Sequence, residues 1–116
     1  MSDQIVSLNA SNLGSSANPL KARIDRRNYL VAAFKSRPLI FQEIRANLGM
    51  TQSTVAIQIG VHLNSVCGWE TGKAIPTIKN AERYYETLEK AATEQGNEPD
   101  AVWCLLRQLV SAPGEE

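Results

Sequence analysis

The residues best suited to recognition chemistry lie together between His62 and Lys73. Asn64 carries a donor and an acceptor on one amide, which suits a two-bond contact with adenine, and the neighbouring Leu63 could pack on a thymine methyl group. Lys73 offers a positive charge to a phosphate, which adds affinity but no sequence choice. These residue types in one short run are typical of contacts to double-stranded DNA.

The chain offers no comparable set for catalysis. Ser, His and Asp do not occur at a plausible spacing for a nucleophilic triad, and no glycine loop is of the kind that cradles phosphate. Cys67 and Cys104 lie far apart and, with the single His62, cannot form a zinc site of known spacing. We therefore expect no enzymatic activity, no metal and no cofactor.

Two short helices around a tight turn are expected to carry the recognition residues. The first would run from about Thr51 to Ile59, because Thr51 is a good N-cap and apolar residues recur at the spacing of a buried face. Gly60 then stands where a left-handed residue is needed.

The second helix would start at His62 and stop near Gly72, with Val66 and Trp69 turned inward. Two helices joined by a short turn containing glycine form a helix-turn-helix, whose second helix enters the DNA major groove.

At these residues the chain resembles the Cro/CI-type (XRE family) helix-turn-helix repressors, over roughly residues 39–88. The matching residues are Met50-Thr51-Gln52, Val55-Ala56, Gly60-Val61, Val66, Trp69-Glu70 and Gly72-Lys73, in register with no gap. The resemblance implies an all-α, lambda-repressor-like helix-turn-helix bundle of about four to five helices. This chain would add an extra N-terminal helix, either packed on the core or part of a dimer contact, and a C-terminal helix.

The resemblance also implies site roles. Base contacts fall on Leu63, Asn64, Ser65 and Gly68, and phosphate contacts on Thr51, Gln52, His62, Thr71 and Lys73. Gly68 has no side chain and could only allow close approach. Leu63 replaces the family's usual polar residue, so shape readout could carry more of the specificity than hydrogen bonds. His62 replaces the usual Ser or Thr, and would either cap the helix poorly or donate to a phosphate when protonated.

Two further implications concern residues that would pack behind the second motif helix. Arg45 and Glu70 stand at positions that form an ion pair in the family, and a buried pair of this kind would fix the angle between helices. Gln52 would both touch a phosphate and brace the start of the second motif helix.

The remaining chain divides into three regions. Residues 1–18 are read as a flexible arm, residues 19–92 as the DNA-binding domain with its motif at 51–72, and residues 93–116 as a linker and C-terminal helix with a short tail. Helices are expected over about 20–34, 38–48, 77–92 and 100–110. The apolar stripe of the last helix would form either a lid on the core or a dimer seam, and we favour the seam.

The inward faces of three of these helices are predicted from apolar spacing. The residues concerned are Leu20, Ile24, Leu30, Val31 and Phe34 in the first, Phe41, Ile44 and Leu48 in the second, and Ile78, Ala81, Tyr85 and Leu88, flanked by Tyr84, in the third. Arg23, Arg26 and Arg27 would lie opposite the apolar side of the first helix, as phosphate contacts or as a solvated basic face.

The net charge is zero, but its distribution is uneven: residues 1–46 carry +4, residues 47–80 carry +1 and residues 81–116 carry −5. We expect a transcriptional repressor that binds a palindromic operator as a homodimer through residues 62–71. The alternatives are an antitoxin-type autoregulator that also binds a protein partner, and an interaction module that has lost DNA binding. With no signal peptide or membrane span expected, the cytoplasm of a bacterial cell is the expected location, with a bacterial, phage or plasmid origin.

Overall fold

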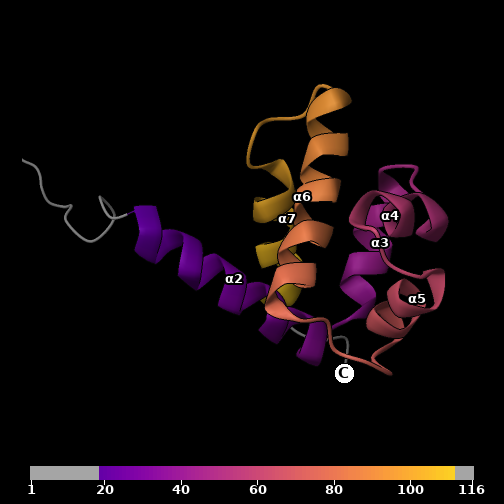
Figure 1. Cartoon of the computed structure of the whole chain (residues 1–116). Helices are drawn as coiled ribbons and strands as arrows, with labels where there is room; N and C mark the ends of the chain where they lie inside the picture. Colours follow the sequence, from indigo (N-terminus) through magenta and orange to yellow (C-terminus); the bar gives the residue numbers. More distant parts are fainter. Residues whose placement is uncertain (1–18, 112–116) are drawn as a thin grey trace, which may run out of the picture.

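The computed structural model describes residues 19–111, and in this part of the chain helices joined by short loops are the only regular secondary structure, as expected (Figure 1). The helices are α2 (Pro19–Ser36), α3 (Leu39–Asn47), α4 (Gln52–Ile59), α5 (Leu63–Thr71), α6 (Ile78–Glu94) and α7 (Ala101–Ser111). The arm predicted at 1–18 and most of the tail lie outside the described residues.

The core lies where α2, α3 and α6 meet. The rings of Phe34 and Phe41 stack with their centroids 3.7 Å apart, and Tyr84 approaches both edge-on. Leu30 and Leu88 are fully buried beside them. Tyr84, which the apolar pattern places at the flank of α6, is therefore a central core residue.

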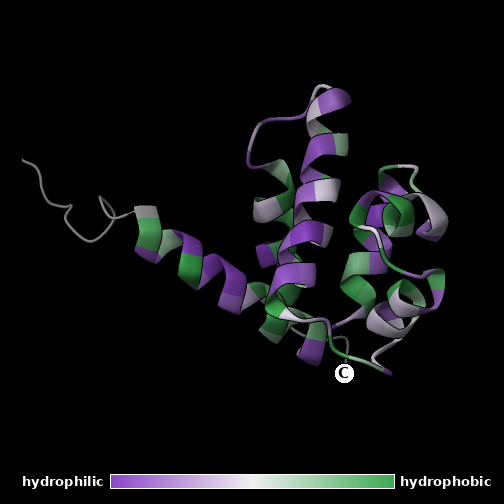
Figure 2. Cartoon of the chain, viewed as in Figure 1, coloured by the Kyte–Doolittle hydropathy of each residue, from purple (hydrophilic) through white to green (hydrophobic). Residues whose placement is uncertain are grey.

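The first half of α2 extends away from the bundle (Figure 1). The side chains of Leu20 and Ile24 are 65% and 45% exposed, so the prediction that they face inward is wrong. The buried apolar residues of α2 all lie in its second half, and Figure 2 shows hydrophobic residues on both halves. Ile78 at the start of α6 is also exposed, contrary to expectation, because its turn lies at the edge of the bundle.

The arginines of α2 face α6 and α7. The Nε atoms of Arg23 and Arg27 lie 3.5 and 3.1 Å from the Glu82 carboxylate, and the guanidinium of Arg26 lies 4.8 Å from the centroid of the Trp103 ring. The side chain of Arg23 stays 66% exposed, as expected for a solvated face, whereas Arg26 and Arg27 are half-buried against these partners. A phosphate contact by these arginines stays a prediction.

Helix α7 covers the core. Val102 and Leu106 are buried, and Leu105 and Leu109 pack against the same cluster in contact with α3 and α6. Of the two uses considered for its apolar stripe, the lid is the one seen. No helix between residues 19 and 111 has the length and hydropathy needed to cross a membrane.

Candidate nucleic-acid interface

A sharp turn joins α4 to α5. Thr51 caps α4, its Oγ1 accepting the backbone N–H of Thr54 at 3.0 Å. Gly60 has φ +86°, a left-handed conformation that other L-residues adopt only with strain, and the N–H groups of Gly60 and Val61 both donate to the Ala56 carbonyl. Val61 then packs against the core. The turn has the form predicted for a helix-turn-helix.

The inner face of α5 is buried as expected. Val66 and Trp69 are 0% and 5% exposed, and they fill the space between α5 and the helices behind it. Ala56 on α4 is also buried, and its small side chain allows the two motif helices to pack closely. These contacts determine which side of α5 faces outward.

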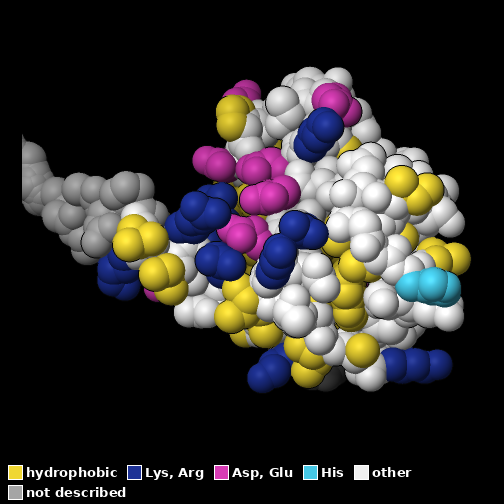
Figure 3. All heavy atoms as spheres, viewed as in Figure 1, with side chains coloured by type: hydrophobic (Ala, Val, Ile, Leu, Met, Phe, Trp, Pro, Cys, Tyr) yellow, Lys and Arg dark blue, Asp and Glu magenta, His cyan; other side chains and the backbone are white. Residues whose placement is uncertain are grey.

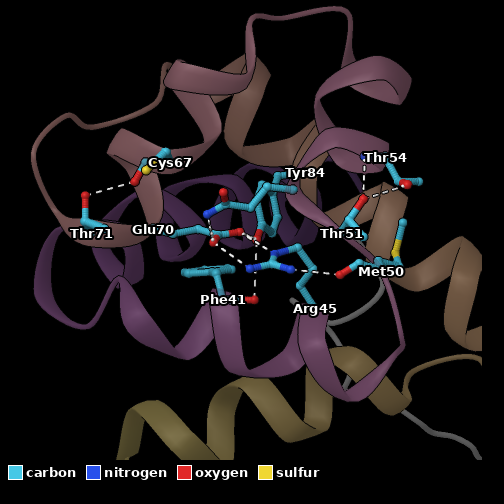
Figure 4. A network of polar contacts seen from close by, with 10 residues as sticks. Phe41, Arg45, Met50, Thr51, Thr54, Cys67, Glu70, Thr71 and Tyr84 are labelled. Atoms are coloured by element: carbon cyan, nitrogen blue, oxygen red, sulfur yellow. Dashed lines mark hydrogen bonds and ion pairs between the residues drawn. The ribbon is translucent and has the colours of Figure 1, made fainter.

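The carboxylate of Glu70, fully buried on α5, binds side chains from three other helices (Figure 4). Arg45 on α3 donates through Nε to Oε2 at 2.7 Å and through Nη2 to Oε1 at 3.0 Å. Gln52 on α4 donates to Oε1 at 2.9 Å, and the Tyr84 hydroxyl on α6 donates to Oε2. The ion pair implied between Arg45 and Glu70 is thus present, within a four-residue network.

The network determines the charge of its members. Burial by itself would raise the pKa of Glu70, but the hydrogen bonds from Arg45, Gln52 and Tyr84 outweigh it and hold the pKa below its ordinary value. The hydrogen bond to Glu70 raises the pKa of Arg45, while burial and the neighbouring carboxylate raise the pKa of Tyr84. The pair is therefore fully ionised near neutral pH, and it fixes the orientation of α5 relative to α3, α4 and α6.

The outer face of α5 carries the residues expected to contact bases. Leu63 and Asn64 are exposed, Leu63 to 41%, and Ser65 is half-buried. Gly68 is half-buried, and a Cβ at this position would lie 3.5 Å from the Ala74 Cβ in the loop after the helix, so its close approach to a base stays a prediction. Leu63 and Asn64 are thus the two candidate base-contact residues that point outward together.

The residues expected at phosphates are distributed around both motif helices. Lys73 is exposed just past α5, beyond Gly72 with φ +83°. His62 is exposed, and its Nδ1 accepts the Asn64 N–H at 3.0 Å, so the expectation that it caps poorly is wrong. Because Nδ1 is the acceptor, Nε2 of the neutral ring carries the proton and can donate outward.

Three of the expected phosphate ligands have side chains engaged within the chain. The Thr51 Oγ1 accepts the Thr54 N–H and shares a second hydrogen bond, 3.0 Å long, with the Thr54 hydroxyl. The Thr71 hydroxyl donates back to the Cys67 carbonyl at 2.9 Å, so its proton is not available to a phosphate while that bond lasts (Figure 4). Gln52 uses one amide N–H on Glu70, which is the bracing role, and keeps a second N–H.

Sequence reasoning missed two residues. Tyr84 stands three residues after Ala81 and four before Leu88, so the same helical periodicity that marked those two as buried includes it. Cys67 stands four residues after Leu63 and is exposed on the same helix, which places it beside the candidate base contacts.

The surface charges separate the two sides of the domain. Acidic side chains gather over α6 next to the basic residues of α2, while the single histidine lies at the opposite edge (Figure 3). The exposed acids of this region are Glu86, Glu94, Glu98 and Asp100. The strongest negative charge is thus remote from α5, which favours the approach of an anionic ligand to the α4–α5 side.

The geometry defines a helix-turn-helix, and comparison with known families agrees. Residues 41–94 match the family model described as Helix-turn-helix. This segment belongs to the Cro/CI-type (XRE) family of helix-turn-helix proteins, and the protein is a DNA-binding transcriptional regulator. Searches of curated proteins and of solved structures returned no match.

Proposed function

We propose that this regulator is a sequence-specific repressor that binds a palindromic operator as a homodimer through α5. The observation that supports it best is the joint exposure of Leu63 and Asn64 on a helix whose opposite side is fixed by Val66, Trp69 and Glu70. A reading helix must be held rigidly, because base contacts depend on hydrogen-bond geometry.

The phosphate contacts in this proposal surround that helix. The start of α4 presents free backbone N–H groups and the second N–H of Gln52. The Thr51 hydroxyl can donate to a phosphate when Thr54 is the donor in the hydrogen bond that the two hydroxyls share. His62 donates from Nε2 at the start of α5, and Lys73 supplies a charge at its end. Contacts at both ends of the motif would set the register of α5 in the major groove.

The homodimer requires an exposed apolar surface, and the stripe of α7 is used within the chain. The exposed side chains Leu20, Ile24 and Ile78 supply one, with Ile24 and Ile78 lining a common shallow hollow. We propose a second copy of this chain as its occupant, since two-fold dimers match the two half-sites of a palindrome. Pairing two such surfaces would also bury the projecting half of α2.

The test is selection of duplexes from a random DNA library by the full chain, followed by sedimentation of the selected complex. We expect half-sites about 10 base pairs apart, centre to centre, and two chains per duplex. Ile24→Glu should give one chain per duplex. Ile57→Glu, at an exposed position on α4, is the control and should leave the dimer intact. Failure to enrich any sequence would contradict the repressor; a two-chain complex with Ile24→Glu would contradict only this dimer surface.

A second candidate function is the antitoxin-type autoregulator. The acidic side chains over α6 favour it, because a DNA-bound chain would still present this surface to a basic protein partner (Figure 3). A basic polypeptide encoded beside this gene should then co-purify with the chain, and charge reversal at Glu86 and Glu94 should release it. Co-purification that survives this reversal would rule the acidic surface out.

A further inference from the structure

Two apolar side chains lie one turn apart on the outer face of α5. Leu63 and Cys67 are separated by four residues, so they project from the same side of the helix, and both are exposed. A free cysteine behaves as a small hydrophobic side chain with only a weak S–H donor. The centre of the proposed reading surface is therefore less polar than DNA hydrogen-bond readout requires.

Most polar residues around this pair either use their side chains in hydrogen bonds within the chain or are partly buried. His62 uses Nδ1 to cap the helix, the Thr71 hydroxyl donates to the Cys67 carbonyl, and Gly68 has no side chain. Ser65 is half-buried. Within residues 63–71, Asn64 is the exposed residue with a side-chain amide, and no hydrogen bond joins that amide to another described residue. The surface thus offers two apolar contacts and one amide.

We propose that Leu63 and Cys67 read the C5-methyl groups of pyrimidines in the major groove, and that Asn64 supplies the one direct hydrogen-bonded base contact. This inference rests on the proposed function and specifies the DNA that it would select. The thymine methyl is the apolar group that a base pair presents in the major groove, whereas guanine and cytosine present acceptors and a donor there. A leucine opposite those polar edges would leave them without partners.

The same chemistry makes a prediction about modified DNA. 5-Methylcytosine carries its methyl group on the same ring carbon as thymine, so methylation of a cytosine opposite Leu63 or Cys67 should strengthen binding. Burial of one methyl group corresponds to a change in affinity of about fourfold.

The experiment uses the full chain and a duplex that it has selected from a random library. Each thymine of one half-site is replaced in turn by deoxyuridine, which removes only the methyl group, and affinity is measured by fluorescence anisotropy. We expect at least one position where deoxyuridine weakens binding by about fourfold. At that position, 5-methylcytosine should bind more tightly than cytosine by a similar factor.

Substitutions on the helix assign the effect to its residues. Leu63→Ala or Cys67→Ser should bring the thymine-to-deoxyuridine ratio at one position close to one, and Ile57→Ala, an exposed apolar residue on α4, should leave every ratio unchanged. All three positions are exposed, so thermal melts should match the parent chain. Selected half-sites without thymine, equal binding of both bases throughout, or ratios that survive both substitutions would overturn the inference. If no duplex is enriched, the proposed function fails instead.

Discussion

The two faces of α5 differ in how many partners their side chains have. On the inner face, Glu70 is fully buried and its two carboxylate oxygens together accept four hydrogen bonds from three helices. On the outer face, Leu63 and Asn64 lie exposed, and no hydrogen bond joins the side-chain amide of Asn64 to another of residues 19–111. The side chains of the inner face make contacts that hold the fold together, whereas those of the outer face have no such role within the described residues.

This difference separates stability from recognition on a single helix. Substitutions on the inner face should lower the free energy of unfolding, and they should affect DNA binding indirectly, through the stability and orientation of α5. Substitutions on the outer face should alter DNA binding with little effect on stability, since exposed positions away from special contacts change it by about 0.5 kcal/mol or less. Each prediction below tests one side of this division.

The largest effect is expected from Glu70→Ala. The substitution leaves the Arg45 guanidinium in a buried site without its carboxylate, and the expected loss of unfolding free energy is about 3–5 kcal/mol. Urea unfolding measures it, and Glu43→Ala, on the exposed side of α3, is the matched control with little expected change. Similar free energies of unfolding for the two variants would show that the network does not stabilise the fold.

The pH dependence of the unfolding free energy should report the ionisation of Glu70 in this network. Because the pKa of Glu70 is lower in the folded chain than its ordinary value of 4.5, its stabilising contribution is complete above that pH. This contribution is lost as the pH falls through the pKa that Glu70 has in the folded chain. The difference in unfolding free energy between the parent chain and Glu70→Gln should therefore be constant near neutral pH and narrow below about pH 4.5. A difference that stays constant down to pH 3 would contradict the assigned ionisation.

Asn64→Ala tests the outer face. We expect the preference for a selected duplex over a random one to fall by about 1–3 kcal/mol, the worth of one two-bond contact to a base. Binding to random DNA and the melting temperature should stay the same, because the Asn64 side chain has no partner within the described fold. Equal losses on both duplexes would show that Asn64 does not read a base.

Much of the motif could be predicted because its signals are local. Thr51 as a cap, Gly60 in a left-handed turn, and Val66 and Trp69 as buried residues each follow from residue type and spacing within a few positions. The Arg45–Glu70 pair spans 25 residues and came from the family resemblance. Periodicity alone identifies neither partner of such a pair.

The predictions that failed depend on where a helix lies in the whole molecule. Leu20 and Ile24 continue the apolar side of α2, but the helix projects past α6, so their spacing carries no information on what covers them. The arginines of α2 raise the charge of the N-terminal part of the chain, yet Arg23 and Arg27 lie against Glu82. A charge count cannot show such pairing because it depends on tertiary contacts.

The smallest effect is expected from Lys73→Ala, which removes a charge at the end of α5 without touching either face. If Lys73 lies at a phosphate, the slope of log affinity against log salt should fall by about one unit per bound chain, equally on selected and random duplexes. Lys90→Ala, on the acidic side of α6, is the matched control and should leave the slope unchanged. The pair separates charge near the DNA from charge in general, because both substitutions lower the net charge by the same amount. A slope that changes equally in both variants would show that Lys73 acts through net charge and makes no phosphate contact.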